Sequence, residues 1–110
     1  MAIKANLIID QGASFESSFN VTDDDDVTIN LTGFTGAAQM RKHYTSVSYY
    51  TFNVTIDAAL GTVTLSMDAN TTNTIPAGRY VYDCELTDTG SNIRSRLVEG
   101  IVTVTPQVTR

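Results

Sequence analysis

Apolar and polar residues alternate with a period of two along most of the 110-residue chain. Successive side chains of a β-strand point to opposite faces of a sheet, so this alternation predicts strands with one buried and one solvated face. Residues typical of turns separate the alternating segments at intervals of about 8–12 residues. The expected strands span residues 13–22, 27–31, 35–42, 50–56, 63–67, 80–87 and 93–105, with a polar connection at 43–48.

The alternation is most regular at residues 50–67, which predict a hairpin with a four-residue loop. A slip of one residue would move the whole apolar set to the solvent face, so the pattern specifies the register well. The pairs that this register predicts are Ile56 with Val63, Val54 with Leu65, and Phe52 with Met67.

The last two strands predict a second hairpin, with Thr89 and Gly90 at its tip. Gly100 interrupts the alternation of the final strand, and a glycine inside a strand often marks a bulge. The predicted inner-face pairs are Tyr82 with Leu97 and Leu86 with Ile93. The predicted outer-face pairs are Asp83 with Arg96 and Glu85 with Arg94, which bring opposite charges together.

Between the two hairpins, residues 68–75 predict one helical turn, with Asp68 as the N-cap and Pro76 ending it. The pattern as a whole predicts one all-β domain over residues 1–110, an antiparallel two-layer β-sandwich of the immunoglobulin-like or a related type. Tyr80 and Tyr82 open a late strand in a way that loosely resembles the immunoglobulin tyrosine corner. The expected core residues are Phe15, Phe19, Phe52, Val54, Ile56, Val63, Leu65, Tyr80, Tyr82 and Leu86.

The composition supports this fold and indicates which classes of partner the chain can bind. The chain has 17 Thr, a β-branched residue that favours strands. Its formal net charge is −5, which argues against nucleic acid or an anionic membrane as the partner. No signal peptide or membrane-spanning run is visible, because no uninterrupted apolar run exceeds three residues.

The residues offer little catalytic chemistry. Cys84 lies on the presumed inner face, where a thiol is normally inert, and the lone His43 falls near a polar connection. Asp83 and Glu85 share a strand face at a spacing that glycosidases also use, but arginines are expected to pair with both. The four aspartates at 23–26 lack the ligand spacing of a calcium loop. We therefore expect no enzyme activity, no catalytic residue, no cofactor and no metal site.

Four stretches carry a family resemblance: residues 31–34 (LTGF), 38–42 (AQMRK), 75–83 (IPAGRYVYD) and 98–104 (VEGIVTV). With them the chain resembles small virion structural proteins of tailed bacteriophages, most of all those of T-even-like cyanophages. It is also similar to the N-terminal domain of phage baseplate upper proteins. The resemblance implies a β-sandwich used for assembly, with no catalytic residues to carry over.

The function expected from this resemblance is a non-enzymatic virion component of the tail, baseplate or fibre, made in the host cytoplasm. Its partners would be other virion proteins, with the chain homo-oligomeric or present in many copies. A capsid decoration (cement) protein and a carbohydrate-binding or adhesion module are the alternatives, although Tyr44 and Tyr49 are the only aromatics outside the inner stripes. The candidate assembly contacts are Arg41, Lys42, His43, Tyr44, Arg94 and Arg96.

Overall fold

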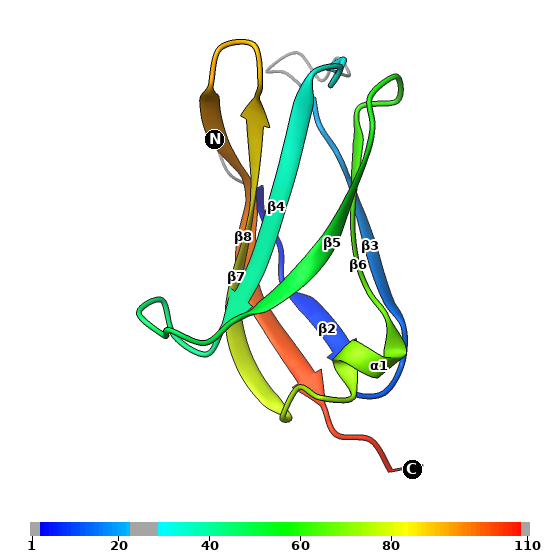
Figure 1. Cartoon of the computed structure of the whole chain (residues 1–110). Coiled ribbons are helices and arrows are strands. Elements are labelled where there is room, and N and C mark those ends of the chain that lie inside the picture. The colour runs from blue at the N-terminus through cyan, green and yellow to red at the C-terminus, as the bar shows by residue number, and fades with distance from the viewer. Residues whose placement is uncertain (1–2, 23–28, 109–110) are drawn as a thin grey trace.

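The computed structural model describes residues 3–22 and 29–108, which contain eight strands and one short helix (Figure 1). The strands are β1 (Ile3–Lys4), β2 (Leu7–Asp10), β3 (Phe15–Asn20), β4 (Phe34–Arg41), β5 (Tyr50–Asp57), β6 (Thr62–Met67), β7 (Gly78–Asp88) and β8 (Ile93–Thr105). The helix is α1 (Ala69–Thr72). The all-β prediction is confirmed.

The strands form one curled sheet in the order β1-β8-β7-β4-β5-β6-β3, with β2 also beside β8. The sheet bends at β5, where residues 50–52 pair with β4 and residues 53–57 pair with β6. We call β1, β2, β8, β7 and β4 the wide layer, and β3, β6 and residues 53–57 the narrow layer. β1 and β2 run parallel to β8, so the expectation of purely antiparallel pairing is wrong at this edge.

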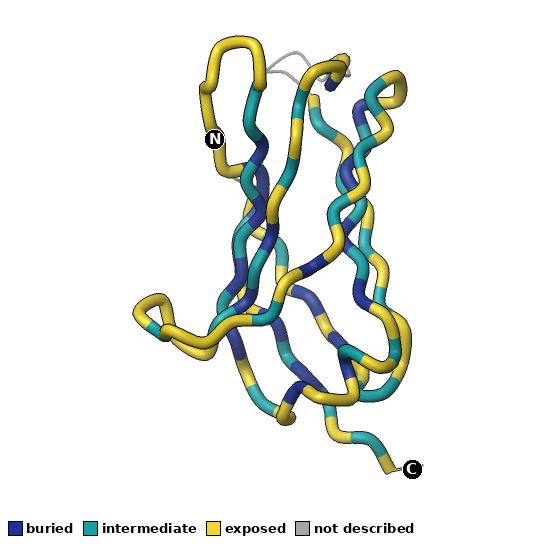
Figure 2. The backbone as a smooth tube through the Cα atoms, in the orientation of Figure 1, coloured by how far each residue is buried: buried dark blue, intermediate teal, exposed yellow. Residues whose placement is uncertain are grey.

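The core lies between the two layers, and buried positions alternate with exposed ones along the strands (Figure 2). Phe52 sits at the bend and contacts both layers, with its ring centroid 5.8 Å from that of Phe15 and 6.1 Å from that of Tyr82. Six of the ten expected core residues are buried: Phe52, Val63, Leu65, Tyr80, Tyr82 and Leu86. The other four are only partly buried, because the narrow layer has fewer neighbouring strands to cover them: Phe15, Phe19, Val54 and Ile56.

The register of the β5–β6 hairpin is confirmed for two of its three predicted pairs. Val54 pairs with Leu65 and Ile56 with Val63, and the loop spans residues 58–61. The third predicted pair, Phe52 with Met67, is wrong, because β5 leaves β6 at the bend. Phe52 instead pairs with Ala38 of β4, and Met67 pairs with Phe15 of β3.

The predicted register of the β7–β8 hairpin is wrong. Tyr82 lies opposite Gly100 and Leu86 opposite Ser95. One cause is the turn, which spans residues 89–92 and places Asn92 in the left-handed region at φ 57°. The other cause is a bulge, which lies near Leu97 rather than at Gly100: residues 84 and 85 pair with residues 98 and 96, and Leu97 is left over.

Gly100 has a different role from the predicted bulge. A Cβ atom at this position would lie 2.2 Å from the carbonyl oxygen of Ala5. The segment between β1 and β2 therefore approaches β8 as closely as it does only because residue 100 has no side chain. The glycine marks a close backbone contact rather than an extra residue.

The helical turn expected within 68–75 and its N-cap are confirmed, but α1 ends at Thr72 with Asn73 as its C-cap, before Pro76 is reached. Asp68 is the N-cap of α1, and its carboxylate accepts a hydrogen bond from the Thr71 amide at 2.8 Å. Hydrogen bonding to the Thr71 side chain first, and to its amide second, lowers the pKa of this carboxyl. The buried Thr72 hydroxyl donates to the Ala13 carbonyl at 2.8 Å, so α1 is fastened to the β2–β3 connection. Within the described residues no helix is long and apolar enough to cross a membrane.

The strand expected at 27–31 is wrong in its described part, because residues 29–31 carry no strand. The side chain of Leu31 is nevertheless buried, so the apolar pattern located a core residue without a strand around it. The aspartates at 23–26 lie outside the described residues.

Candidate functional site

Four of the six predicted contact residues lie on the outer side of the wide layer. Arg41 ends β4, Tyr44 follows it in the connection to β5, and Arg94 and Arg96 lie on β8. The sheet order β8-β7-β4 places β7 between these strands, so its outward-pointing residues join them. This outer face is the candidate functional site.

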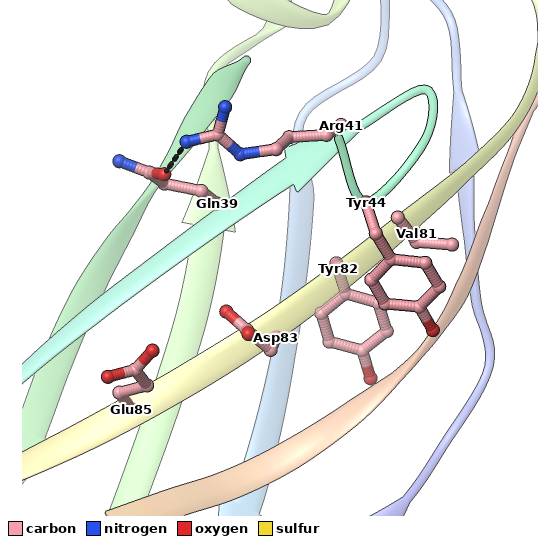
Figure 3. A pocket seen from close by; sticks show the side chains of 7 residues that line it. All are labelled: Gln39, Arg41, Tyr44, Val81, Tyr82, Asp83 and Glu85. Carbon is pink, nitrogen blue, oxygen red and sulfur yellow. Dashed lines mark hydrogen bonds between the residues drawn. The ribbon is translucent and has the colours of Figure 1, made fainter. Parts of the chain in front are cut away.

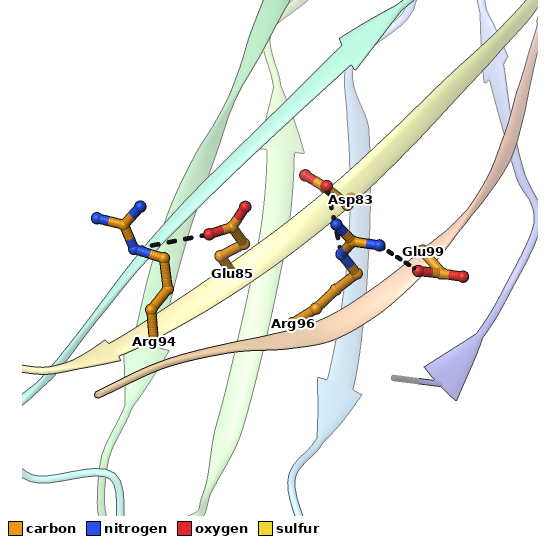
Figure 4. Close-up of polar contacts among 5 residues, drawn as sticks. All are labelled: Asp83, Glu85, Arg94, Arg96 and Glu99. Atoms are coloured by element: carbon orange, nitrogen blue, oxygen red, sulfur yellow. Dashed lines mark hydrogen bonds and ion pairs between the residues drawn. The ribbon is translucent and has the colours of Figure 1, made fainter. Parts of the chain in front are cut away.

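An ion-pair ladder crosses β7 and β8; it consists of Asp83, Glu85, Arg94, Arg96 and Glu99 (Figure 4). The Nε atom of Arg94 lies 3.7 Å from Oε2 of Glu85, and that of Arg96 lies 3.5 Å from Oδ2 of Asp83. Both predicted charge pairs are therefore confirmed. They form diagonally, because Glu85 lies directly opposite Arg96 in the observed register and the long arginine side chains reach one pair further.

The ladder is open to solvent. The side chains of Arg94 and Arg96 are 70% and 50% exposed. Exposed ion pairs of this kind contribute only about 0.2–1 kcal/mol each to folding. Their charges therefore add little to stability and remain accessible to another surface.

Asp83, like Glu85 and Glu99, is a partly buried carboxylate of the ladder. Burial raises the pKa of its carboxyl above the ordinary value, the charge of Arg96 opposes this rise, and the acidic neighbours Glu85 and Glu99 add to it. Arg96 also donates from Nη1 to Oε2 of Glu99 at 2.9 Å, and this hydrogen bond is the main reason that the pKa of Arg96 is raised. One guanidinium thus holds two carboxylates on the outer face.

Arg41 organises the connection between β4 and β5, which projects from the side of the molecule (Figure 1). Its Nη1 donates to the Ser46 carbonyl at 2.6 Å, and its Nη2 donates to the side-chain oxygen of Gln39 at 3.0 Å. Its guanidinium also lies over the Tyr49 ring, 4.7 Å from the centroid. Arg41 is therefore occupied within the chain and acts by holding the connection in place.

The other two predicted contact residues, Lys42 and His43, do not form a basic cluster with Arg41. The ammonium group of Lys42 lies 4.9 Å from the centroid of the Tyr80 ring. His43 begins a tight turn in which the Ser46 amide donates to its carbonyl at 3.0 Å. The turn leaves Tyr44 82% exposed. The sequence-adjacent group Arg41, Lys42 and His43 is thus divided by the fold.

A shallow groove lies beside the ladder, lined by Gln39, Arg41, Tyr44, Val81, Tyr82, Asp83 and Glu85 (Figure 3). A second hollow continues along β4 over residues 35–39, where the small side chain of Ala37 leaves the outer surface low. Gln39 and Val81 were not predicted as site residues. The alternation of the strands could have identified them, because Gln39 lies two residues from Arg41 on β4 and Val81 lies two residues from Asp83 on β7. Residues two apart on a strand point to the same face.

Cys84 lies in the core, His43 lies in the exposed connection between β4 and β5, and the paired acids lie on the outer face. Cys84 is fully buried, and burial together with the nearby acids Asp83 and Glu85 raises the pKa of its thiol to about 11. Across residues 3–22 and 29–108, no group of three or more His, Cys, Asp or Glu could hold a metal ion. Asp83 and Glu85 are engaged by arginines, as expected.

The resemblance to a tyrosine corner has a structural counterpart. The Tyr80 hydroxyl donates to the Pro76 carbonyl at 2.6 Å, four residues upstream. This is the hydrogen bond that a corner tyrosine makes in immunoglobulin-like sandwiches. It fixes the entry of β7, the strand that carries the acids of the ladder.

Comparison with curated proteins finds no match. Comparison with protein families finds one whose description is "LtfC-like, beta-sandwich domain", and it matches residues 2–105. The match spans nearly the whole chain and agrees with the two curled layers of strands. The chain therefore belongs to the LtfC-like β-sandwich domain family, which is related to phage tail fibres.

Proposed function

We propose that this chain is a non-enzymatic structural component of a phage virion, associated with the tail or its fibres, and that it binds another virion protein through the outer face of the wide layer. The observation that carries the proposal is the family match over residues 2–105. This family relation supports the phage and structural parts of the expectation. The T-even-like cyanophage type and the baseplate location remain predictions.

The geometry of the outer face suits protein–protein contact. Its positive and negative side chains are interspersed, so it presents no single-sign field of the kind that binds nucleic acid. The exposed ring of Tyr44 stands beside these charges, and Tyr and Arg are enriched at protein interfaces. A partner surface with the complementary pattern of charges would fit this face.

Quantitative mass spectrometry of purified particles tests the proposal. The chain should be found at a fixed copy number, and labelled chain should locate on the tail in electron micrographs. Particles lacking the polypeptide would refute the proposal, and labelling of capsomers alone would favour a capsid decoration protein instead.

The docking face is tested by exchanging two charges, in the double variant Glu85→Arg/Arg94→Glu. The exchange keeps the ion pair and the net charge while inverting the pattern that a partner meets. We expect the isolated domain to fold normally and its incorporation into particles to fall. The matched control is the double variant Asn53→Lys/Thr55→Glu, which also keeps the net charge, lies on the exposed face of the narrow layer and should incorporate as the original chain does.

Glycan binding is a second candidate, favoured by the exposed Tyr44 ring beside Gln39, Asp83 and Glu85 in one groove. Aromatic rings and planar polar groups can bind sugars together. A glycan array with the original chain and Tyr44→Ala distinguishes the two candidates. Binding that the substitution abolishes would establish the glycan function, and absence of binding would eliminate it.

A further inference from the structure

The two edges of the curled sheet differ in how they end. β3 is the last strand on the narrow side, and it pairs with β6 over all six residues from Phe15 to Asn20 without a register shift. Among the described residues no strand pairs with its other side. An edge of this kind presents backbone donors and acceptors to any extended chain.

The opposite edge carries the features that protect edge strands. β1 has two residues and β2 has four, and the segment between them breaks the edge. Asn6 inserts its side-chain oxygen there and accepts a hydrogen bond from the Ile101 amide at 3.1 Å. Charged Lys4 and Asp10 are exposed on the same edge. β3 has no Pro, no Lys and no bulge, and Glu16 is its one charged residue, so it is less protected than the opposite edge.

The hydrogen bonding shows which groups of β3 face outward. The Val21 amide, next to the end of β3, donates to the Gly61 carbonyl at 2.7 Å. In an antiparallel ladder alternate residues bond to the same neighbour, so the odd-numbered residues of β3 bond to β6. The backbone groups of Glu16, Ser18 and Asn20 therefore point to the open edge.

We propose that β3 pairs with β3 of a second copy of this chain, antiparallel and about a two-fold axis, with Ser17 facing its own counterpart. The sequence of residues 15–19 is Phe-Glu-Ser-Ser-Phe, which presents similar side chains when read in either direction. In this register Phe15 lies opposite Phe19 of the second copy. Glu16 lies opposite Ser18 of the second copy, and these are the residues whose backbone groups point outward.

A shift of the pairing by two residues also keeps the core-facing side chains of both copies on the same face of the sheet. Both such alternative registers are less favourable than the proposed one. A shift by two residues in one direction places Glu16 opposite its own counterpart, and like charges directly opposite are destabilising. A shift in the other direction places Phe19 opposite Ser17 and loses both aromatic pairs. The proposed register also covers Phe15 and Phe19, which the isolated chain leaves only partly buried.

Sedimentation equilibrium of the purified chain, up to its solubility limit, tests the association. We expect a monomer–dimer equilibrium that Ser18→Pro abolishes, because proline removes an amide of the open edge and spares the bonds from β3 to β6. Circular dichroism confirms that the variant remains folded. A chain that is monomeric at every concentration, or a dimer that folded Ser18→Pro leaves intact, would overturn the proposal.

Charge substitutions at Ser18 test the register and do not depend on the proline variant. Ser18→Lys would face Glu16 of the second copy twice per dimer and should tighten the dimer by roughly two- to thirty-fold, whereas Ser18→Glu should weaken it by a similar factor. Thr55→Lys and Thr55→Glu are the matched controls. Thr55 is also exposed on the narrow layer, but it lies on β5, and β6 separates it from the open edge of β3. Both control variants should leave the dimer nearly unchanged. Equal effects of Lys and Glu at position 18 would contradict the register.

Discussion

The outer faces of the two layers are built from different residues. The wide layer presents five charged side chains in a ladder, beside a groove and a connection held by Arg41. The narrow layer presents neutral cross-strand pairs, such as the hydroxyls of Ser18 and Thr64 at 2.8 Å and Thr62 donating to Asn20 at 3.3 Å. A charged face can select one partner by complementary charge. The narrow layer also exposes Glu16 and Asp57 but has no ion-pair ladder among the described residues, so we expect its recognition to depend more on its open edge.

Phe52 lies where the two layers meet, and its removal is the largest predicted effect. Phe52→Ala should lower the free energy of unfolding by about 3–5 kcal/mol, because the cavity would lie between both layers. Urea denaturation measures the change. Thr51→Ala, on the exposed neighbour, should change stability by less than about 0.5 kcal/mol. A loss below about 1 kcal/mol for Phe52→Ala would show that the layers do not depend on this ring.

Arg41 holds the connection between β4 and β5 of the wide layer in place. Removing its side chain is the change expected to have the second-largest effect on stability. Arg41→Ala should cost about 1–3 kcal/mol, in the range for hydrogen bonds to charged groups. Amide hydrogen exchange should accelerate at residues 43–49, since the bond to the Ser46 carbonyl is lost. Arg79→Ala is the control. Unchanged exchange in the connection would contradict the role given to Arg41.

The side-chain pairs on the exposed faces of the two layers should each contribute a small and similar amount to the free energy of unfolding. Arg94→Ala should cost about 0.2–1 kcal/mol in the wide layer, and high salt should reduce this cost. Ser18→Ala in the narrow layer should cost about 0.5–1.5 kcal/mol with no dependence on salt, because its partner is a hydroxyl. Thermal melts at two salt concentrations measure both. A salt-dependent cost at Ser18 would contradict the contrast between the faces.

Asp83 gives the smallest predicted effect, a pH dependence that arises in the wide layer. Burial raises the pKa of this carboxyl in the folded chain, so the folded chain favours its protonated form. The stability from this group is therefore present below the unfolded pKa and is lost as pH rises through the folded pKa. In Asp83→Asn the free energy of unfolding should fall less steeply across this acidic range. A steeper fall in the variant would reverse the assigned sign.

The two hairpins show what the sequence could and could not predict. The alternation in β5 and β6 is unbroken and the loop is short, so pairing Val54 with Leu65 required only the pattern. In β7 and β8, two features that alternation does not encode shifted the register: the turn at Asn92 and the bulge at Leu97. Leu97 and Val98 are both buried, and this adjacent apolar pair was the available signal for the bulge.

The candidate site was predictable where long side chains tolerate a shifted register. Arg94 and Arg96 reach their predicted acids diagonally, so the charge pattern alone sufficed. The role of Arg41 was not predictable, because its partners include backbone carbonyls of a connection whose path depends on the whole fold. Lys42, its neighbour in sequence, instead lies over Tyr80.

The most direct test of the proposed function is an electron cryomicroscopy map of intact particles in which this chain is traced. The account predicts density for the chain in the tail or its fibres, with another virion polypeptide covering the ladder formed by Asp83, Glu85, Arg94, Arg96 and Glu99. A map in which the chain lies in the particle with this face open to solvent, and with its contacts made elsewhere, would contradict the account.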